Sequence, residues 1–254
     1  MINMIASLFR ILPLFIIMLV VGIIAFVKGF RWLSRKRLIE NTPTSKVRSL
    51  AMGLVEVFGE AVPWKEKLEA PLSSKDCVYY KYLIEEYKSS GKSGHWVVID
   101  RGESQSPFFL KDETGMVLID PKDADIAMSS DVKIESSKDP PKNIKLFLSS
   151  RGLKYEGFLG INKHMRYQEW HLAPGDELYI MGTAEDYPSK DIIAKRGTAN
   201  MIIRKGKYEK FYYISDRPEK TVLKSLHRRV LGSIIGGGSL IIAATILLLF
   251  IFAL

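Results

Sequence analysis

The chain has 254 residues, a formal net charge of +9 and a single cysteine, Cys77. One cysteine excludes an intramolecular disulfide and any zinc site built from cysteine pairs. The positive charge does not indicate nucleic-acid binding, because residues 49–216 hold 24 basic and 26 acidic groups and the excess lies outside them. That central stretch contains no helix-turn-helix, zinc-finger or basic–aromatic groove pattern, so no nucleic-acid partner is expected.

The first predicted element is an apolar segment near the N-terminus. Residues 11–27 (ILPLFIIMLVVGIIAFV) carry no charge, and residues 1–9 are also apolar. A helix rises 1.5 Å per residue, so crossing a hydrocarbon core of about 30 Å takes about 20 apolar residues. A cleaved signal peptide is the alternative, but the segment runs into Lys28 and Arg31 without a small-residue cleavage motif. We predict an uncleaved transmembrane anchor over residues 1–27.

Basic residues flank the central stretch on both sides. Residues 28–48 hold seven basic groups and one acid, and residues 217–229 hold five basic groups and one acid. We read both segments as juxtamembrane linkers that contact anionic headgroups, where each basic group gains about 1 kcal/mol. The groups expected at the membrane surface are Lys28, Arg31, Arg35, Lys36, Arg37, Arg228 and Arg229. Because basic flanks remain in the cytoplasm, we predict a cytoplasmic central domain with both termini outside.

Residues 49–216 have the composition of a β-rich domain. Short runs rich in Val, Ile, Tyr and Phe are separated by Gly, Pro and Asp. One amphipathic helix is predicted at residues 140–151 and a second at residues 44–51, and the turn at residues 112–115 predicts a hairpin. The predicted strands are Gly53–Ala61, Cys77–Tyr87, His95–Arg101, Phe108–Lys111, Gly115–Ile119, Met165–Leu172, Glu177–Ala184, Ile192–Ala194, Met201–Arg204 and Phe211–Ser215.

Two of these strands resemble each other. Residues 53–61 (GLVEVFGEA) and 175–184 (GDELYIMGTA) each contain a glycine, an alternating apolar run, a second glycine and a small residue. Small barrels use glycine in this way to let a strand curve sharply. We predict an α+β, barrel-like domain with one or two short helices. Whether it consists of two related halves, or the likeness reflects β composition alone, stays open.

The second apolar segment ends the sequence. Residues 230–254 carry no charge, and 25 residues are enough to cross a bilayer with some tilt. Small residues at Gly232, Gly236, Ser239 and Ala243 fall on one helix face, with a G-x-x-x-G spacing between the first two. This face is expected to pack against the first span or against another copy of the chain. The alternative is that small residues are simply common in membrane helices.

No catalytic constellation is found. The sequence lacks a G-x-S-x-G elbow, a phosphate-binding loop and an H-E-x-x-H motif, and its four histidines are scattered. Cys77 lies in an apolar run and is expected to be a buried structural thiol. The acidic residues Asp112, Glu113, Asp120, Asp123 and Asp125 lack calcium-loop spacing and are expected to be solvated turn residues. We therefore expect no catalytic residue, metal or cofactor.

The ordered set of motifs resembles the GIDE family, whose domain is also called BAM, for "beside a membrane". The similar segments are residues 44–61, 70–82, 107–124, 169–184 and 213–219, together with both flanking spans. The resemblance implies the anchored domain and its fold. Ligase members of the family carry a RING after the second span, which needs eight Cys or His ligands. The sequence ends at Leu254 and does not supply them.

Three hypotheses for function follow. The first is a membrane-anchored interaction or scaffold domain without a catalytic site of its own, which binds a protein partner or organises the membrane. The second is a component of a ubiquitin-like ligation pathway in which another chain supplies the RING. A channel or transporter is the weakest hypothesis, because two spans without polar intramembrane residues offer no ion path unless many copies assemble. For the first hypothesis, binding is expected around the hairpin at residues 87–96.

Overall fold

The computed structural model describes residues 2–91, 93–157, 160–187 and 198–253. The chain forms two compact units. A helical unit contains residues 1–42 and 219–254, and a central unit contains residues 43–218.

The helical unit consists of two long helices, α1 (Ile2–Asn41) and α4 (Glu219–Ala253). By length and composition, both are able to cross a membrane. Each continues beyond its uncharged run into a segment that we predicted as a basic linker. α1 ends just before Thr42-Pro43, where the proline disfavours helical geometry in the preceding residue. α4 begins directly after Pro218, and Glu219 in its first turn interacts favourably with the helix dipole.

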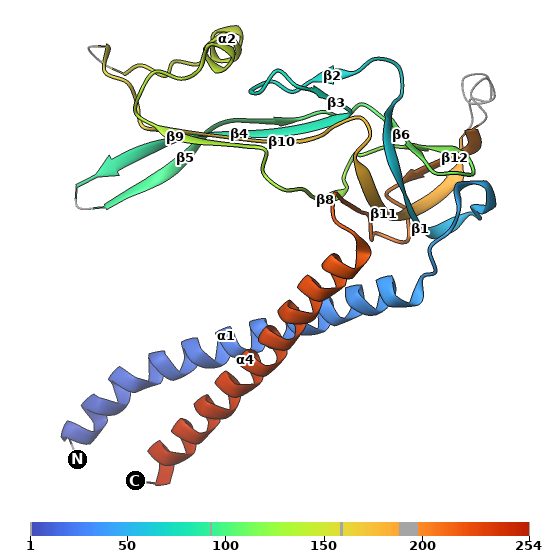
Figure 1. The fold of residues 1–254 in the computed structure, drawn as a ribbon. Helices are drawn as coiled ribbons and strands as arrows, with labels where there is room; N and C mark the ends of the chain where they lie inside the picture. The colour runs from blue at the N-terminus through green and yellow to red at the C-terminus, as the bar shows by residue number, and fades with distance from the viewer. Residues whose placement is uncertain (1, 92, 158–159, 188–197, 254) are drawn as a thin grey trace. The chain divides into compact units, whose positions relative to one another are not determined.

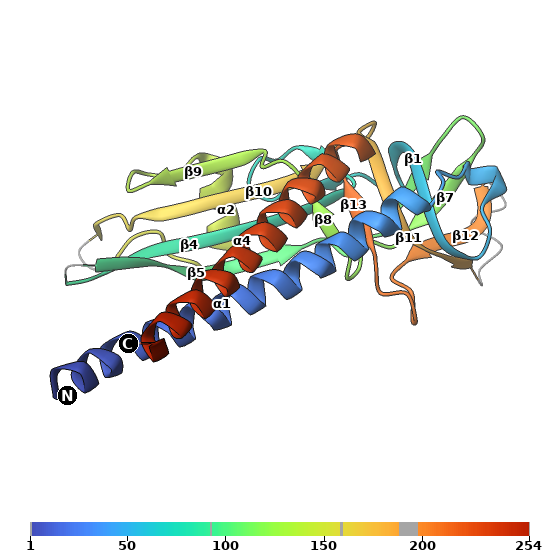
Figure 2. The ribbon, with the colours of Figure 1, turned by 90° about the horizontal axis from the view of Figure 1, so that it is seen from below.

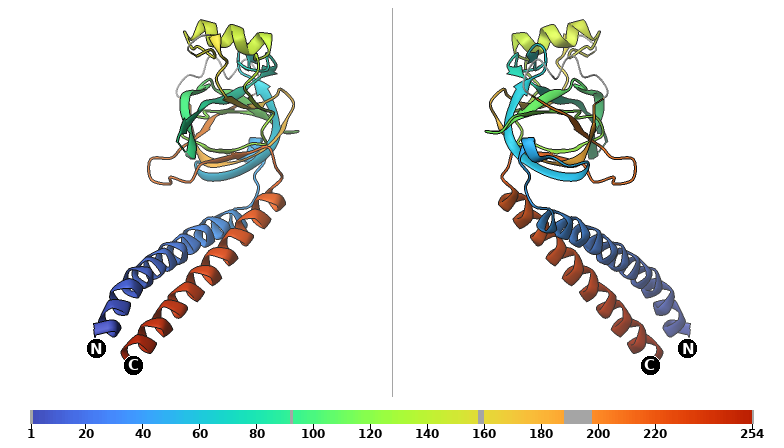
Figure 3. Two further views of the ribbon diagram at one scale, coloured as in Figure 1. Left: turned by 90° about the vertical axis from the view of Figure 1, so that its left-hand side faces the viewer. Right: turned by 90° about the vertical axis from the view of Figure 1, so that its right-hand side faces the viewer.

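The central unit is built around a closed five-stranded barrel. Its strands are β1 (Gly53–Pro63), β6 (Phe108–Lys111), β7 (Met116–Ile119), β12 (Thr198–Arg204) and β11 (Glu177–Asp186), in that spatial order, and β1 pairs with β11 to close the ring (Figure 3). When the five barrel strands β1, β6, β7, β11 and β12 are numbered one to five along the chain, their spatial order is 1-2-3-5-4-1. Strands three and five (β7 and β12) are parallel, and this is the topology of the OB-fold. The barrel-like, β-rich fold class is confirmed.

Strand β1 closes the barrel because it pairs with two neighbours in succession. Its residues 53–60 pair with β11, and its residues 60–63 pair with β6. At this transition a Cβ added to Gly59 would lie 2.3 Å from the Lys111 carbonyl oxygen, so only glycine lets the strands approach so closely. Alternate residues fill the interior, among them Val55, Val57, Phe108, Leu110, Val117, Ile119, Leu178, Ile180 and Ile203.

A second sheet is formed by two insertions into the barrel. Its order is β5 (Ser93–Glu103), β4 (Tyr79–Ser90), β10 (Met165–Leu172) and β9 (Val132–Ser136), all antiparallel. β4 and β5 follow the first barrel strand, whereas β9 and β10 follow the third. Helix α2 (Lys142–Ser150) lies over one face of this sheet (Figure 1). Ile144 and Leu148 of α2 pack there on Tyr82, Ile84 and Tyr167.

The remaining elements are short. β8 (Asp125–Ala127) and β13 (Tyr213–Ser215) extend the barrel sheet beyond β11, and β2 (Leu68–Glu69) pairs with β3 (Asp76–Cys77). The helix predicted at residues 140–151 is present as α2. The helix predicted at residues 44–51 is wrong, since only a 3₁₀ turn forms at Val47–Ser49. Thr44 instead forms a bridge with Glu56, and the predicted strand at residues 192–194 lies outside the described residues.

Candidate functional site

Helices α1 and α4 pack against each other in antiparallel orientation (Figure 2). Glycines form the seam between them. A Cβ added to Gly29 would lie 2.6 Å from a side-chain carbon of Ile234, and one added to Gly237 would lie 2.6 Å from the Phe26 backbone nitrogen. At Gly22 the nearest atom would be 3.0 Å away, on Ile241. Small residues therefore bring the two backbones together, which is the usual way for membrane helices to gain packing contacts.

The four small residues predicted for helix packing lie on a different face of α4. A Cβ added to Gly232 or Gly236 would meet nothing within 4 Å, and Ser239 and Ala243 are exposed. Helix α1 instead contacts the face that carries Val230, Gly237 and Ala244, which are spaced by seven residues and buried. The seam residues Gly22, Gly29 and Gly237 were not predicted. Packing of the Gly232 face against another copy stays a prediction.

The basic residues predicted at the membrane surface lie where the uncharged runs end. Six of them are exposed: Lys28, Arg31, Arg35, Arg37, Arg228 and Arg229. The seventh, Lys36, is half-buried and forms an ion pair of 2.9 Å with Glu40, one turn further along α1. Two of the exposed arginines stack on one indole. The guanidinium carbon of Arg35 is 5.3 Å from the centre of the Trp32 ring, and that of Arg229, on α4, is 5.0 Å away.

In the central unit, the sheet face opposite α2 carries a row of aromatic, aliphatic and charged side chains, which we call the exposed face. Val98 is 49% and Tyr87 39% exposed. The exposed face consists of Trp96, Val98, Arg101 and Glu103 from β5, Lys81, Leu83, Glu85 and Tyr87 from β4, Arg166, Gln168 and Trp170 from β10, and Lys133 and Glu135 from β9. Lys81, Leu83, Arg101, Glu103 and Trp170 line a groove at one end of it.

The other end of the exposed face is an ordered aromatic cluster, which includes both ends of the hairpin predicted to bind. The rings of Tyr87 and Trp96 lie 5.3 Å apart, and the His164 ring lies 5.3 Å from Trp96. The guanidinium carbon of Arg166 is 3.8 Å from the centre of the Trp96 ring. Arg166 also bonds Glu135 at 3.0 Å and Glu85 at 3.3 Å. The aromatic surface is thus held in place by paired charges.

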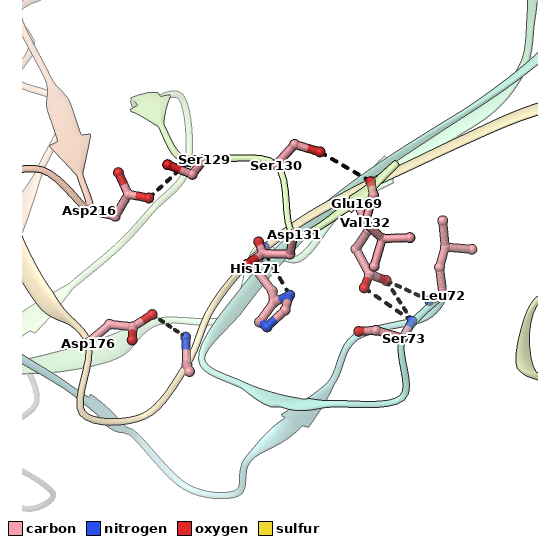
Figure 4. Close-up of polar contacts among 11 residues, drawn as sticks. Leu72, Ser73, Ser129, Ser130, Asp131, Val132, Glu169, His171, Asp176 and Asp216 are labelled. Carbon is pink, nitrogen blue, oxygen red and sulfur yellow. Dashed lines mark hydrogen bonds and ion pairs between the residues drawn. The ribbon is translucent and has the colours of Figure 1, made fainter. Parts of the chain in front are cut away.

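A buried carboxylate fixes this sheet to the loop before β3. Glu169 is fully buried, and its carboxylate accepts hydrogen bonds from the backbone N–H of Leu72 at 2.5 Å and of Ser73 at 3.1 Å (Figure 4). The loop turns sharply at Ser74, which has a positive φ of 56°. Consecutive amides that point to one carboxylate form an anion-binding concavity, here filled by a residue of the same chain.

The segment at residues 128–132 connects the barrel sheet with the second sheet. The Ser129 N–H donates to the Asp216 carboxylate at 2.8 Å (Figure 4), three residues before the start of α4. The Asp131 N–H donates to the Glu169 carbonyl at 3.0 Å. The Asp131 carboxylate in turn accepts the backbone N–H of His171 at 2.9 Å. These bonds fix the position of the second sheet relative to the barrel.

The outer face of β6 and β7 corresponds to the surface with which OB-folds bind oligonucleotides and oligosaccharides. Phe109 and Leu118 occupy it and are fully or almost fully buried. Val62, Trp64, Met116 and Tyr187 pack against them. The usual ligand surface of the fold is therefore covered by the protein's own side chains.

Two residues considered above for catalysis or metal binding, Cys77 and Asp112, have structural roles. Cys77 is buried, and burial, with Glu169, Asp76 and Glu69 nearby, raises the pKa of its thiol to about 12. Asp112 caps the β6–β7 turn through Thr114 and Gly115 and accepts the Val47 N–H at 2.9 Å. Burial alone would raise the pKa of Asp112, but these hydrogen bonds lower it below its usual value.

In the part of the chain that the structure describes, no group of three or more His, Cys, Asp or Glu residues is arranged to hold a metal ion. The Asp112 carboxylate is instead occupied by backbone amides and the Thr114 hydroxyl. His171 lies with its Nδ1 3.4 Å from Asp131, and His164 belongs to the aromatic cluster.

Comparison with known proteins yields one family. The family model for GIDE, described as an E3 ubiquitin ligase, matches residues 79–249, about two thirds of the chain. No curated protein and no solved structure gives a significant match. The matched range contains the whole second sheet, four of the five barrel strands and most of α4. The chain belongs to the GIDE family.

Proposed function

We propose that this protein is a membrane-anchored interaction domain whose exposed face binds a protein partner beside the bilayer. The exposed face carries the proposal. It combines Trp96, Trp170 and Tyr87 with arginine, the residue types enriched in interaction hot spots, beside the apolar side chains of Leu83 and Val98. Arg166 and Trp96 are already ordered by stacking on each other and by the ion pair of Arg166 with Glu85, which lowers the entropic cost of binding.

The anchoring part of the proposal rests on α1 and α4. Both helices are long and apolar enough to span a bilayer, and exposed basic residues lie at one end of each uncharged run, after it in α1 and before it in α4. The positive-inside rule then favours a cytoplasmic central domain, termini on the outer side and contact between the basic residues and anionic headgroups. Protease shaving of right-side-out cells tests this orientation. The central unit should survive until the membrane is permeabilised, and its digestion in intact cells would contradict the orientation.

Affinity purification in mild detergent, with a matched pair of variants, tests whether a protein partner binds the exposed face. Val98→Glu places a charge on the exposed face, and Leu146→Glu places one on the outer side of α2, where Leu146 is 63% exposed. We expect one reproducible partner with the wild type and with Leu146→Glu, and at least about tenfold less with Val98→Glu. An equal loss with both variants would contradict the assignment of the face. Failure to recover any reproducible partner would contradict the proposal itself.

A second candidate function is favoured by the family match. The family model is described as an E3 ubiquitin ligase, so the domain could serve a ubiquitin-like ligation pathway. A RING needs eight Cys or His ligands, and the 254 residues contain one Cys and four His. In this alternative another chain supplies the RING. The isolated protein, incubated with activating and conjugating enzymes, should then give no transfer, and robust transfer would refute the alternative in this form.

A further inference from the structure

One groove on the exposed face combines basic and apolar side chains. It crosses β5, β4 and β10, which run side by side in that order (Figure 1), and has a volume of about 620 Å³. Sites that hold a ligand-sized group have volumes of about 300–1,000 Å³. We call it the β4 groove, and its lining includes Lys81, Leu83, Arg101, Glu103 and Trp170.

The strand pairings fix how these side chains are arranged. Leu83 lies two residues from Lys81 along β4 and directly opposite Arg101 on β5. Lys81 in turn lies between Trp170 on β10 and Glu103 on β5. Side chains that are opposite each other on one face have Cβ atoms about 4.5–5.5 Å apart, so they form one continuous surface. Leu83 and Trp170 therefore give the groove an apolar surface with a cation beside each of them.

The two cations of the β4 groove are not neutralised by acids. Lys81 and Arg101 are exposed, and among the residues that the structure describes neither side chain forms an ion pair. Glu103, which also lines the groove, accepts a hydrogen bond from the hydroxyl of the buried Tyr79 at 3.0 Å. At the other end of the exposed face, by contrast, the charges are paired. The β4 groove is thus the part of the face that can gain an ion pair from a ligand.

A ligand of the β4 groove does not bind by adding a strand to the sheet. β5 is the edge strand, but the Arg101 N–H donates to the Asp100 carboxylate at 2.9 Å. The pairing of β4 with β5 also shifts in register between Ile84 and Glu85, which marks a bulge. Bulges and charged side chains at an edge are ways in which proteins prevent strand pairing. Side chains of the ligand therefore make the contacts.

A peptide fits the β4 groove better than a membrane surface does. The exposed face as a whole contains four basic and three acidic residues, which are Lys81, Arg101, Lys133 and Arg166, and Glu85, Glu103 and Glu135. A flat layer of anionic headgroups would meet nearly as many acids as bases on this face, and would gain little. A peptide enters the groove alone, where it can present a carboxylate together with an apolar side chain.

We propose that the β4 groove binds an acidic segment of a partner protein. An Asp or Glu of the partner lies between Lys81 and Arg101, and a neighbouring apolar side chain packs on Leu83 and Trp170. The inference rests on the proposed function and names the chemistry of its partner. The apolar contacts supply most of the affinity, and the two cations select acidic partners and raise the association rate.

The test selects peptides from a phage-displayed random library on the full-length protein in mild detergent. We expect Asp or Glu next to Leu, Phe or Trp, enriched at least about threefold over the unselected library. The best peptide, labelled with fluorescein, is then bound to variants and followed by fluorescence polarisation. A Lys81→Gln, Arg101→Gln double variant should weaken binding at least about tenfold, which corresponds to about 1.4 kcal/mol.

Two control variants separate the groove from general charge. Lys133→Gln removes a basic group from an exposed position on the same face but outside the groove, and should weaken binding less than about twofold. Glu103→Gln removes a like charge from the groove and keeps an acceptor for the Tyr79 hydroxyl, so it should strengthen binding about two- to threefold. Short-chain phosphatidylglycerol should not displace the peptide.

Four results would overturn the inference. These are selected peptides without enrichment of acidic residues, equal losses with the double variant and with Lys133→Gln, weaker binding to Glu103→Gln, and displacement of the peptide by phosphatidylglycerol. The second would show diffuse attraction, and the last would assign the groove to lipid.

Failure of the proposed function has a different signature. In that case affinity purification recovers no reproducible partner even with the wild type. If a partner is recovered, lost with Val98→Glu and fully kept with the Lys81→Gln, Arg101→Gln double variant, the proposed function holds and the inference about an acidic segment fails.

Discussion

The buried carboxylate of Glu169 provides the sharpest test of how the second sheet is held. In Glu169→Gln the side-chain shape is kept, but one of its two acceptor atoms becomes an NH₂ donor. In the wild type the carboxylate accepts the N–H groups of both Leu72 and Ser73. In the variant, at least one of these two amides would face the NH₂ group, which is another donor. A hydrogen bond to a charged group contributes about 1.5–3 kcal/mol, and an unsatisfied buried donor costs about 1–3 kcal/mol. We expect Glu169→Gln to lower the free energy of unfolding by about 3 kcal/mol.

The assay is thermal unfolding of the full chain in detergent, followed by tryptophan fluorescence. For a unit of this size 1 kcal/mol shifts Tm by about 2–4 °C, so a decrease of about 6–12 °C is expected. Glu135→Gln is the matched control, because Glu135 lies on the same sheet but is exposed and paired with Arg166. An exposed pair contributes about 0–1 kcal/mol. If both variants shift Tm equally, the reasoning about the buried carboxylate is refuted.

Three further outcomes follow from the same structure. The thiol of Cys77 is buried, and its raised pKa of about 12 leaves little thiolate at pH 8. Maleimide should therefore label the native protein at least about 100-fold more slowly than the unfolded chain. Equal labelling rates would contradict the burial of Cys77. Gly237→Leu should separate α1 from α4 and lower the thermal stability of the helical unit, whereas a Gly232→Leu, Gly236→Leu double variant should keep the pair and weaken only crosslinked dimers. Unchanged dimer crosslinking in the double variant would remove self-association through that face. The pKa of Asp112 is lowered in the folded state, so its stabilisation is complete above the unfolded pKa of about 3.9 and is lost as the pH falls through the lower folded value. Asp112→Asn should therefore reduce stability by about 1–2 kcal/mol at pH 7 and progressively less below pH 4, and a pH-independent difference would argue against this role.

The elements with strong residue patterns were predictable from the sequence. The strands at residues 108–111 and 165–172 have the predicted bounds, and the helix after Pro140-Pro141 forms where proline allows it to start. Short strands such as β8 and β2 were missed, since two or three residues carry no usable periodicity. Their pairing depends on partners far away in the chain.

The site was only partly predictable for a similar reason. The sequence contains three consecutive glycines at 236–238, and nothing local distinguishes Gly236 from Gly237. Which glycine of α4 lies in the seam depends on its contacts with α1. In α1 the seam residues Gly22 and Gly29 are seven residues apart, and this spacing is visible in the sequence. The exposed face was not predictable either. Trp96, Arg166 and Trp170 share one face only because β10 pairs with β4, between residues that are 79 to 93 positions apart in the chain.

The central claim is that α1 and α4 hold this protein in a membrane. It is tested most directly by expressing the untagged full chain, lysing cells without detergent, washing the membranes with alkaline carbonate and centrifuging at high speed. The protein should remain in the pellet and enter the supernatant only after detergent is added, because two helices of this length and composition cannot leave the bilayer under alkaline wash. Recovery of the intact chain in the detergent-free supernatant would contradict the account.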